Sequence, residues 1–365
     1  MNRRTLQTGA AATGAVAVAG GGGFVQWASQ GAGAWQAATN DLRRPFDPSG
    51  GTAELVRYAT LAANSHNTQP WRFVVAGRSI VIHPDFARRT PVVDPDDHHL
   101  FASLGCAAET IVQTAPLAGL SASVAFDAGG EGVVVDLASG PVTATERAAA
   151  IPHRQCTRSV YDGRAVPADA LRALEAAGAG EGVHVRLFTE RRSIDDILAF
   201  IVDGNTQQID DPAFVAELKE WIRFSYRAAL TTADGLFAKC SGNPVLPGFV
   251  GPLLFGLVFS AGAENPKIVE QVGSSSGIAV FVSDKDDKAH WVEAGRAYQR
   301  FALQATALGI RHAFLNQPVE VAEVRHRFAG HLGLGGGRPD LVVRFGYGPE
   351  MPMSLRRPVA DVLVA

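Results

Sequence analysis

The sequence predicts an α+β fold made of two similar halves that pack as an intramolecular pseudo-dimer. Helical and strand-like segments alternate along most of the 365 residues. When the sequence is shifted by 190 residues, an Asp pair, an alanine and two glycines of one helical segment coincide with the same residue types in another. The coinciding positions are Asp96-Asp97 and Asp286-Asp287, Gly105 and Gly295, Ala107 and Ala297, and Gly119 and Gly309. One α+β unit used twice is the arrangement that a fused homodimer would have.

Composition allows a large core and argues against two classes of site. The 47% apolar and 19% charged residues are ordinary globular values. The three cysteines are far apart and form no CxxC pattern, so neither a zinc site nor a disulfide framework is expected. The net charge of −3 includes no basic block, so no nucleic-acid partner is expected.

Residues 1–34 predict an export signal or an N-terminal anchor. Arg3-Arg4 precede an uncharged Gly/Ala/Val run from Thr8 to Val25, and Ala32-Gly33-Ala34 supplies an A-x-A cleavage site. The paired arginines resemble a twin-arginine signal. They imply the twin-arginine export machinery and a periplasmic or cell-envelope location, with membrane attachment through this segment if it is retained; a cytoplasmic location is the alternative. Residues 35–50 contain two prolines and are expected to be a linker.

Residues 51–150 are the first predicted half. Its expected elements are a helix from residue 52, strands at 73–75 and 80–83, a helix from 94 to about 117, and strands at 122–126 and 133–137. His98-His99 could be a metal pair, but adjacent helical residues point in different directions and no third ligand is near. We expect the two histidines to be a solvated helix start.

Residues 151–365 are the second predicted half, with an insertion at about 193–262. Outside the insertion, helices are expected to end at residue 177 and to span 288–308, and strands are expected at 183–188, 278–282 and 341–345. Two helical stretches from 193 to 230 precede an apolar, Gly- and Pro-rich loop at 231–262. Such a loop indicates a lid or a partner surface. A membrane hairpin at Phe249–Ala261 is the less favoured alternative, because that run is too short to span. The glycines of 333–337 are a weak dinucleotide-loop signal, because a strand follows them.

The segment from Asn64 to Phe73 carries the clearest functional signal. It joins a helix to a strand and contains five uncharged side chains that both donate and accept hydrogen bonds. They are Asn64, Ser65, Asn67, Thr68 and Gln69. Such a set suits a flat polar ring better than a metal or a phosphate, and a polar loop without a ligand is the alternative. Further along, Arg154 and Arg158 can converge on one phosphate if their segment is helical or turn-like; two solvated arginines are the alternative.

The motif S-H-N-T-Q-P-W-R-F at 65–73 resembles the flavin-contacting motif of nitroreductase-like FMN flavoproteins, and R-x-x-x-R-x-x-Y at 154–161 resembles their second flavin element. The resemblance covers about residues 52–363. It implies the nitroreductase-like fold, in which FMN lies between two subunits. It assigns these cofactor-binding residues: Ser65, His66, Asn67, Gln69, Arg154, Arg158, Ala313, Phe314, Leu315, Arg356 and Arg357. The corresponding loop of the second half is only Gly178-Ala179-Gly180-Glu181-Gly182, so one FMN per chain is expected. Trp71 is expected to pack beneath the loop.

The resemblance implies an FMN-dependent oxidoreductase that reduces small nitro or quinone acceptors, with NAD(P)H as electron donor and no catalytic side chain. One alternative is a non-catalytic FMN-binding or FMN-sequestering protein of the cell envelope. Another is a flavin-free interaction protein that uses the 231–262 surface.

Overall fold

The computed structural model describes residues 29–364. The export-signal prediction therefore lies outside the described residues except for its last six positions. The predicted first half contains α3 (Gly51–Thr60), β1 (Trp71–Ala76), β2 (Ser79–Pro84), α4 (His98–Thr114), β3 (Leu120–Asp127), β4 (Gly132–Ser139) and α5 (Glu146–Ala150). The second contains α6 (Ala168–Ala177), β5 (Val183–Phe188), β8 (Gly277–Ser283), α12 (Lys288–Ala307), β9 (Arg311–Phe314), α13 (Gln317–Glu320), α14 (Ala322–His331) and β10 (Arg338–Gly346). The strands expected in both halves are confirmed.

The two halves contain sheets with the same strand order. The first sheet runs β1-β2-β4-β3 and the second β5-β8-β10-β9, and all neighbours within these two sets are antiparallel. The first sheet gains a parallel edge strand from the end of the chain, β11 (Leu363–Val364), which pairs with β1 and follows α15 (Val359–Val362). The C-terminal tail of the second half thus becomes part of the first sheet.

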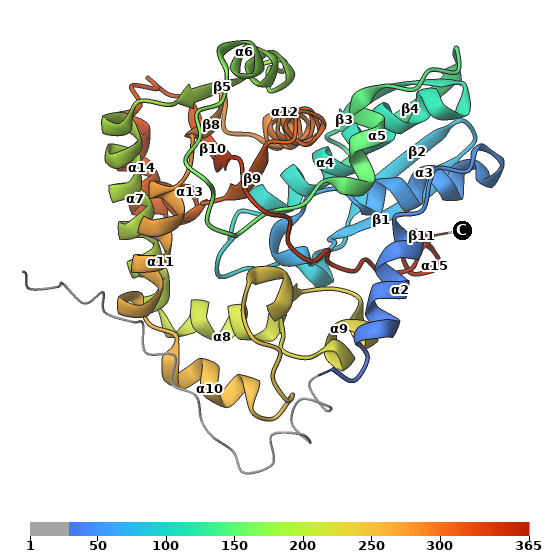
Figure 1. The fold of residues 1–365 in the computed structure, drawn as a ribbon. Helices are drawn as coiled ribbons and strands as arrows, with labels where there is room; N and C mark the ends of the chain where they lie inside the picture. The colour runs from blue at the N-terminus through green and yellow to red at the C-terminus, as the bar shows by residue number, and fades with distance from the viewer. Residues whose placement is uncertain (1–28, 365) are drawn as a thin grey trace, which may run out of the picture.

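Helices α4 and α12 lie side by side between the two sheets (Figure 1). Their contact is reciprocal at the glycines that the sequence shift aligned. A Cβ on Gly105 would lie 1.9 Å from the Val292 carbonyl oxygen, and a Cβ on Gly295 would lie 1.9 Å from the Ala102 carbonyl oxygen. Ala102 and Val292 are themselves 190 positions apart, so each helix presents the same glycine to the same position of the other. Only glycine permits this approach of the two backbones.

The elements of the insertion are α7 (Arg191–Asp210), α8 (Pro212–Trp221), β6 (Ile222–Arg223), α9 (Tyr226–Thr232), β7 (Leu236–Phe237), α10 (Gly251–Val258) and α11 (Ala261–Gly273). The apolar loop therefore contains a short helix, α10. In Figure 1 the middle of the insertion, with α8, α9 and α10, lies below the two sheets, whereas α7 and α11 at its two ends lie at the left beside α13. Across residues 29–364, no helix is both long enough and apolar enough to cross a membrane.

The segment expected to be a linker is largely helical. Helix α2 (Ala32–Leu42) begins within the expected cleavage site and packs against α9 of the insertion. Trp35 explains the difference, because its ring is buried against Tyr226 and Phe237, with centroid distances of 5.8 and 5.6 Å. Proline and glycine at 45–51 mark only the connection from α2 to α3.

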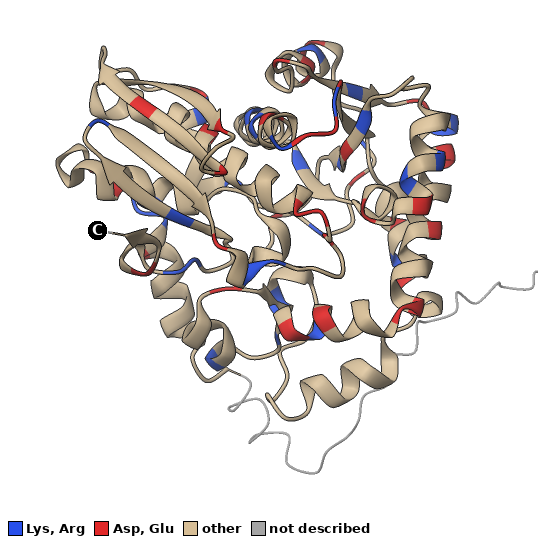
Figure 2. Cartoon of the chain, turned by 180° about the vertical axis from the view of Figure 1, so that it is seen from behind, with Lys and Arg blue, Asp and Glu red and all other residues tan. Residues whose placement is uncertain are grey.

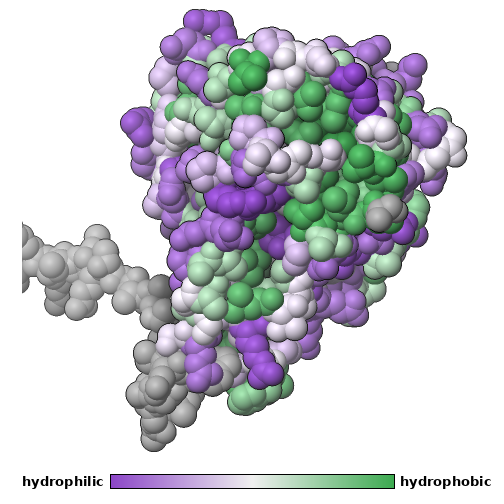
Figure 3. All heavy atoms as spheres, turned by 90° about the vertical axis from the view of Figure 1, so that its right-hand side faces the viewer, coloured by the Kyte–Doolittle hydropathy of each residue, from purple (hydrophilic) through white to green (hydrophobic). Residues whose placement is uncertain are grey.

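The outer face of the first sheet is only partly covered. One row of paired residues across it is Val364, Val74, Val81 and Val134, all of them partly or largely exposed. Figure 3 shows apolar residues gathered on this side of the molecule, near the end of the chain. The opposite face of the same sheet supplies Phe73, Ile80 and Ile82 to the core shared with α4 and α12.

Candidate functional site

A cavity of about 390 Å³ lies where the two halves, the insertion and the C-terminal tail meet. Its volume is within the usual range of small-molecule sites. The first half contributes residues 63–67 and the start of α4, and the second contributes Tyr298, Phe314 and Leu341. The insertion contributes Phe214, Leu218 and residues 235–237 and 240–241. The insertion therefore forms a wall of the cavity.

The amide-rich loop at 64–70 has an unusual backbone. His66, Asn67 and Gln69 have φ angles of 45°, 54° and 54°, in the left-handed region that side chains other than glycine seldom adopt. Such conformations each cost roughly 1–3 kcal/mol and persist only where the surroundings hold them. Three such residues within a single turn of the chain indicate that the loop is built to present particular groups.

Hydrogen bonds from two loop amides hold this conformation. The Asn67 Nδ2 donates to the carbonyl oxygens of Gly235, at 3.0 Å, and Leu355, at 3.3 Å. The Gln69 Nε2 donates to the Ala233 carbonyl at 2.9 Å, and its Oε1 accepts from the Arg357 backbone N–H at 2.8 Å. The loop is thereby joined to the insertion and to the C-terminal tail.

The loop residues expected at the cofactor divide into two groups. Ser65, His66 and Asn67 line the cavity, whereas the fully buried Gln69 does not. Trp71 is fully buried in the core beneath the loop, as predicted. The side chain of Gln69 is used to connect segments of the protein, which the sequence motif alone could not distinguish from ligand binding.

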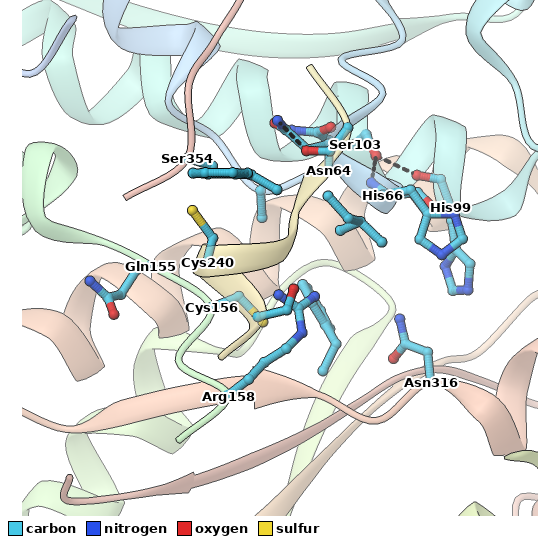
Figure 4. A pocket seen from close by; sticks show the side chains of 18 of the residues that line it. Asn64, His66, His99, Ser103, Gln155, Cys156, Arg158, Cys240, Asn316 and Ser354 are labelled. Carbon is cyan, nitrogen blue, oxygen red and sulfur yellow. Dashed lines mark hydrogen bonds between the residues drawn. The ribbon is translucent and has the colours of Figure 1, made fainter. Parts of the chain in front are cut away.

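The segment that contains Arg154 and Arg158 is not helical. The helical or turn-like conformation on which the predicted phosphate site depended is therefore not formed. Arg154 has φ −64° and ψ 128°, and no regular helix includes Arg158. Both still line the cavity together with Cys156. Gln155 lines the cavity as well, so the segment follows the cavity wall and does not alternate as a strand would. Figure 4 shows the Arg158 side chain directed into the cavity.

Four arginines line the cavity, and none of them forms an ion pair with a carboxylate in residues 29–364. They are Arg43, Arg154, Arg158 and Arg356. Burial lowers the pKa of Arg43 to about 10, with a further contribution from the nearby charge of Arg154. Burial, with the charges of Arg43 and Arg154, also places the pKa of Arg356 well below its ordinary value. Four arginines that pair with no carboxylate among the described residues, two of them buried (Arg154 and Arg356), suit an anion.

The predicted arginines differ in how much of their hydrogen-bonding capacity the protein uses. Arg356 donates to the carbonyls of Thr60 at 2.7 Å, Ala62 at 3.3 Å and Leu355 at 2.9 Å, so it closes the C-terminal end of α3. Arg154 donates to the Leu61 carbonyl at 2.9 Å. The remaining predicted cation, Arg357, does not line the cavity, and its side chain donates to the Asp361 carbonyl at 2.8 Å.

Five buried polar atoms on cavity-lining residues have no hydrogen-bond partner in residues 29–364. They are Arg43 Nη1, His66 Nδ1, Asn67 Oδ1, Arg154 Nε and Gln317 Oε1. Unpaired buried polar atoms are costly, so their concentration at one cavity indicates a polar ligand. On the side of the loop they are the ring nitrogen of His66 and the acceptor oxygen of Asn67. On the side of the arginines they are the N–H donors of Arg43 and Arg154. That distribution fits a molecule with a polar ring at one end and an anion at the other.

Of the predicted segment at 313–315, only one residue reaches the cavity. Phe314 lines it, whereas Ala313 and Leu315 are buried outside it. The strand alternation of β9 explains this result, since neighbouring side chains point to opposite faces. Tyr298 of α12 lies beside Phe314, with a centroid distance of 4.4 Å, and supplies more aromatic surface to the same wall.

The interpretation of His98-His99 as a solvated helix start was wrong, because both side chains are buried. His98 Nε2 lies 2.9 Å from Asp340 Oδ1, and the Nδ1 atoms of the two histidines are 3.2 Å apart. His99 Nε2 lies 3.4 Å from Glu320 Oε1, and both His99 and Glu320 line the cavity. In the described part of the chain, no group of three or more His, Cys, Asp or Glu side chains is placed to hold a metal ion.

This network contains groups with shifted pKa values. Burial raises the pKa of Asp340 to about 8. Burial opposes the charged form of His99, but its hydrogen bond to Glu320 and the charge of Asp94 prevail and raise its pKa. Burial lowers the pKa of His66 to about 4, so this side chain is neutral at pH 7. In Figure 4, His66 and His99 lie together at one side of the cavity.

The shifted pKa of Asp340 predicts a pH dependence of stability. Between the ordinary pKa near 4 and about 8, the folded chain holds a proton that the unfolded chain has released, so stability falls as pH rises through this range. In Asp340→Asn this contribution is expected to vanish, which removes up to about 1.4 kcal/mol per pH unit from the slope. Denaturant unfolding of both proteins from pH 5 to 9 measures it. Parallel curves for the two proteins would show that Asp340 titrates normally.

Sequence reasoning missed two parts of the site. Arg43 follows α2, in the segment expected to be a linker, and lines the cavity. The sequence does not distinguish it from its neighbour Arg44, which does not line the cavity. Glu320 and Gln208 come from α13 and α7, and Gln208 Nε2 donates to Glu320 Oε2 at 2.7 Å. Only the tertiary packing of the insertion brings these residues to the cavity. No local pattern distinguishes them from surface residues.

No family profile matches the chain. The chain is 26% identical over 336 residues to a protein of Mycobacterium tuberculosis (strain ATCC 25618 / H37Rv) that carries the provisional name NAD(P)H nitroreductase, and the match covers 85% of this chain and 91% of the relative. The protein of strain CDC 1551 / Oshkosh with that name gives the same values.

Comparison with solved structures gives lower similarity. The FMN-dependent nitroreductase of Mycobacterium smegmatis, solved with NADPH, shares 16% identity at a TM-score of 0.38, over 57% of this chain and 94% of that chain. A nitroreductase of Desulfitobacterium hafniense DCB-2 with bound FMN shares 15% identity at a TM-score of 0.38, over 61% of this chain and 99% of that chain. By sequence, the chain is thus similar to these two mycobacterial proteins over most of its length.

Proposed function

We propose that the chain is an FMN-dependent oxidoreductase of the nitroreductase type, with the flavin in the cavity described above. The observation that carries the proposal is the composition of this one cavity. A strained, amide-rich loop forms one side of it, and arginines without acidic partners among the described residues form another. The relatives' nitroreductase names, and the FMN and NADPH bound by the compared structures, agree with this proposal.

The residues divide between the two ends of the cofactor. Ser65, His66 and Asn67 would face the ring system or the ribityl chain, and the unpaired Nδ1 of His66 and Oδ1 of Asn67 are available to it. Arg154 and Arg158, with Arg43, would hold the phosphate, because planar guanidinium groups suit its oxygens. The bound flavin supplies the hydride and electron chemistry. NAD(P)H is the proposed donor, and small nitro or quinone compounds are the proposed acceptors.

The walls contributed by this chain would exclude water and orient the ligand. Phe214, Phe259 and Leu218 of the insertion supply apolar surface to the cavity. The neutral His66 stands beside the His99–Glu320 pair, which can hold a proton at His99 Nε2. A proton held at the cavity wall suits a reduction that adds protons as well as electrons.

We further propose that the chain is a fused pseudo-dimer with one flavin per monomer. The identical strand orders and the reciprocal Gly105 and Gly295 contacts support the fusion. In the second half, the position of the loop is closed. Arg300 Nη2 donates to the Ala179 carbonyl at 2.8 Å, and a Cβ on Gly180 would lie 2.4 Å from Glu293 Oε1. These contacts of α12 side chains with the short glycine loop support a single flavin site per chain.

The absorbance spectrum of the purified protein tests the cofactor. We expect a yellow protein that binds one FMN per chain, and NAD(P)H oxidation with nitroaromatic or quinone acceptors. Full flavin occupancy without turnover by any donor would indicate a flavin-sequestering protein. A colourless protein that fails to bind added FMN would exclude both functions and favour an interaction protein. The export signal and the envelope location remain predictions, which fractionation of cells that express the full chain would test.

A further inference from the structure

An exposed apolar surface lies on the insertion, at the lower end of the molecule in Figure 1. We define the apolar tip as four side chains on and before α10: Phe249, Leu253, Leu257 and Val258. They are 83%, 66%, 75% and 64% exposed. The chain has no charged residue between Cys240 and Ala263. In Figure 2, α10 accordingly carries neither blue nor red residues, unlike α8 above it. Clustered exposure of large apolar side chains marks an interaction site.

The tip is held in place by aromatic packing. Phe255 of α10 contacts Phe224 at a centroid distance of 6.2 Å and stacks on Phe259 at 4.4 Å. The Leu246 N–H donates to the Phe224 carbonyl at 2.8 Å, which fixes the loop before α10. Phe259 lines the cavity, whereas the tip residues just before it are exposed. Phe259 at the end of this element thus faces the cavity, whereas the tip side chains of the same element are exposed within residues 29–364.

The chain enters the described structure beside the insertion. Helix α2 packs against α9 of the insertion, and a Cβ on Gly31 would lie 3.2 Å from the Tyr226 Cβ. The uncharged run from Thr8 to Val25 ends only a few residues before this point in the sequence. The described chain therefore begins against the same insertion that carries the apolar tip.

We propose that the apolar tip is a membrane-docking surface that enters the interfacial region of a lipid bilayer. Helix α10 has eight residues. It is about 12 Å long at 1.5 Å per residue, whereas a bilayer core is about 30 Å thick. It cannot span, but exposed Phe and Leu side chains without nearby charges suit partial insertion among lipid headgroups and acyl chains. The apolar run at the N-terminus would approach the same bilayer.

The apolar tip also indicates the kind of electron acceptor that would reach the cavity, an inference that rests on the proposed function. The stacked Phe255 and Phe259 connect the tip to the cavity wall through apolar contacts. Docking would bring this wall close to the lipid. An acceptor with an apolar tail, such as a lipid-soluble quinone, would then reach the cavity without crossing bulk water.

Site-specific fluorescence tests the docking surface in the full chain. Tryptophan is introduced in Phe249→Trp, and in Val142→Trp as a control at a 78% exposed apolar position outside the insertion. The proteins are mixed with vesicles of phosphatidylcholine and phosphatidylglycerol whose acyl chains carry bromine. We expect quenching of the added tryptophan at 249 and none at 142. Equal quenching at the two positions, or none at either, would overturn the proposal, even where the N-terminus alone binds vesicles.

A charged double variant provides the second measurement. Leu253→Asp with Leu257→Asp is expected to lower vesicle affinity by about tenfold or more, since both side chains lose the gain from apolar burial. Loss of self-association instead, without vesicle binding by the parent protein, would identify the surface as a contact between two copies and overturn the proposal. With flavin-loaded protein, turnover of a vesicle-embedded quinone should fall in the variant, while that of a soluble quinone stays unchanged. Absence of turnover with both quinones would count against the oxidoreductase function and leave the vesicle measurements valid.

Discussion

Replacement of Arg154 and Arg158 together by alanine is expected to weaken FMN binding by two orders of magnitude or more. Both residues line the cavity without a carboxylate partner among the described residues, and Arg154 Nε is unpaired there. A hydrogen bond to a charged group contributes roughly 1.5–3 kcal/mol, so the loss of two corresponds to at least a hundredfold. Equilibrium binding of FMN, followed by flavin fluorescence, measures the change.

Riboflavin separates phosphate binding from damage to the whole site, because it has the same ring and no phosphate. The double variant should retain the riboflavin affinity of the parent protein. Arg191→Ala serves as the matched control, since Arg191 is exposed, lies outside the cavity lining, and contacts only surface partners among the described residues, Asp195 and the Gly273 carbonyl. It should bind both ligands normally. An equal loss of FMN and riboflavin affinity in the double variant would show that these arginines do not hold the phosphate.

The largest expected effect on stability is at the contact of α4 with α12. In Gly105→Ala the new Cβ would lie 1.9 Å from the backbone oxygen of Val292, so the two helices must separate. Overpacking against side chains typically costs 1–3 kcal/mol, and a backbone oxygen cannot move aside, so we expect a loss of about 3 kcal/mol or more. The shift of the denaturation midpoint measures this loss of stability, and Gly295→Ala should show a similar loss.

Gly330→Ala is the matched control for this prediction. Gly330 lies in α14, and a Cβ there would meet no atom within 4 Å. Alanine favours a helix over glycine by up to about 1 kcal/mol, so this variant should be as stable as the parent or slightly more stable. Equal stability of Gly105→Ala and Gly330→Ala would mean that the helices do not approach as closely as described.

The sequence predicted the elements that have strong local patterns. Strands β1 to β5, β8 and β10 were expected within a few residues, because their apolar alternation and flanking turns are local properties. Helix α12 was expected from its apolar stripe and its Asp287 cap, which accepts a hydrogen bond from the His290 N–H. The glycine repeat even indicated which two helices correspond, although it could not show that they touch.

Features that depend on tertiary packing were not predictable. His98 and His99 were predicted to be solvated because acidic residues precede them in the sequence. Their partners in the structure, Asp340 and Glu320, lie more than 200 positions away. Gln69 belongs to the flavin-like motif but bonds to Ala233 and Arg357 from distant segments. Arg43 had no distinguishing pattern at all. The sequence thus indicated the chemistry of the site better than the set of residues that form its walls.

The reciprocal glycine contact has a consequence for how the cavity is assembled. Helices α4 and α12 belong to one chain, so the two halves meet at a fixed effective concentration that dilution does not change. A two-subunit enzyme loses its interfacial sites when its subunits dissociate. Here the Ser65–Asn67 loop and the arginine segment stay together at any protein concentration. A protein released singly outside the cell, where no partner subunit is at hand, would keep its cavity intact.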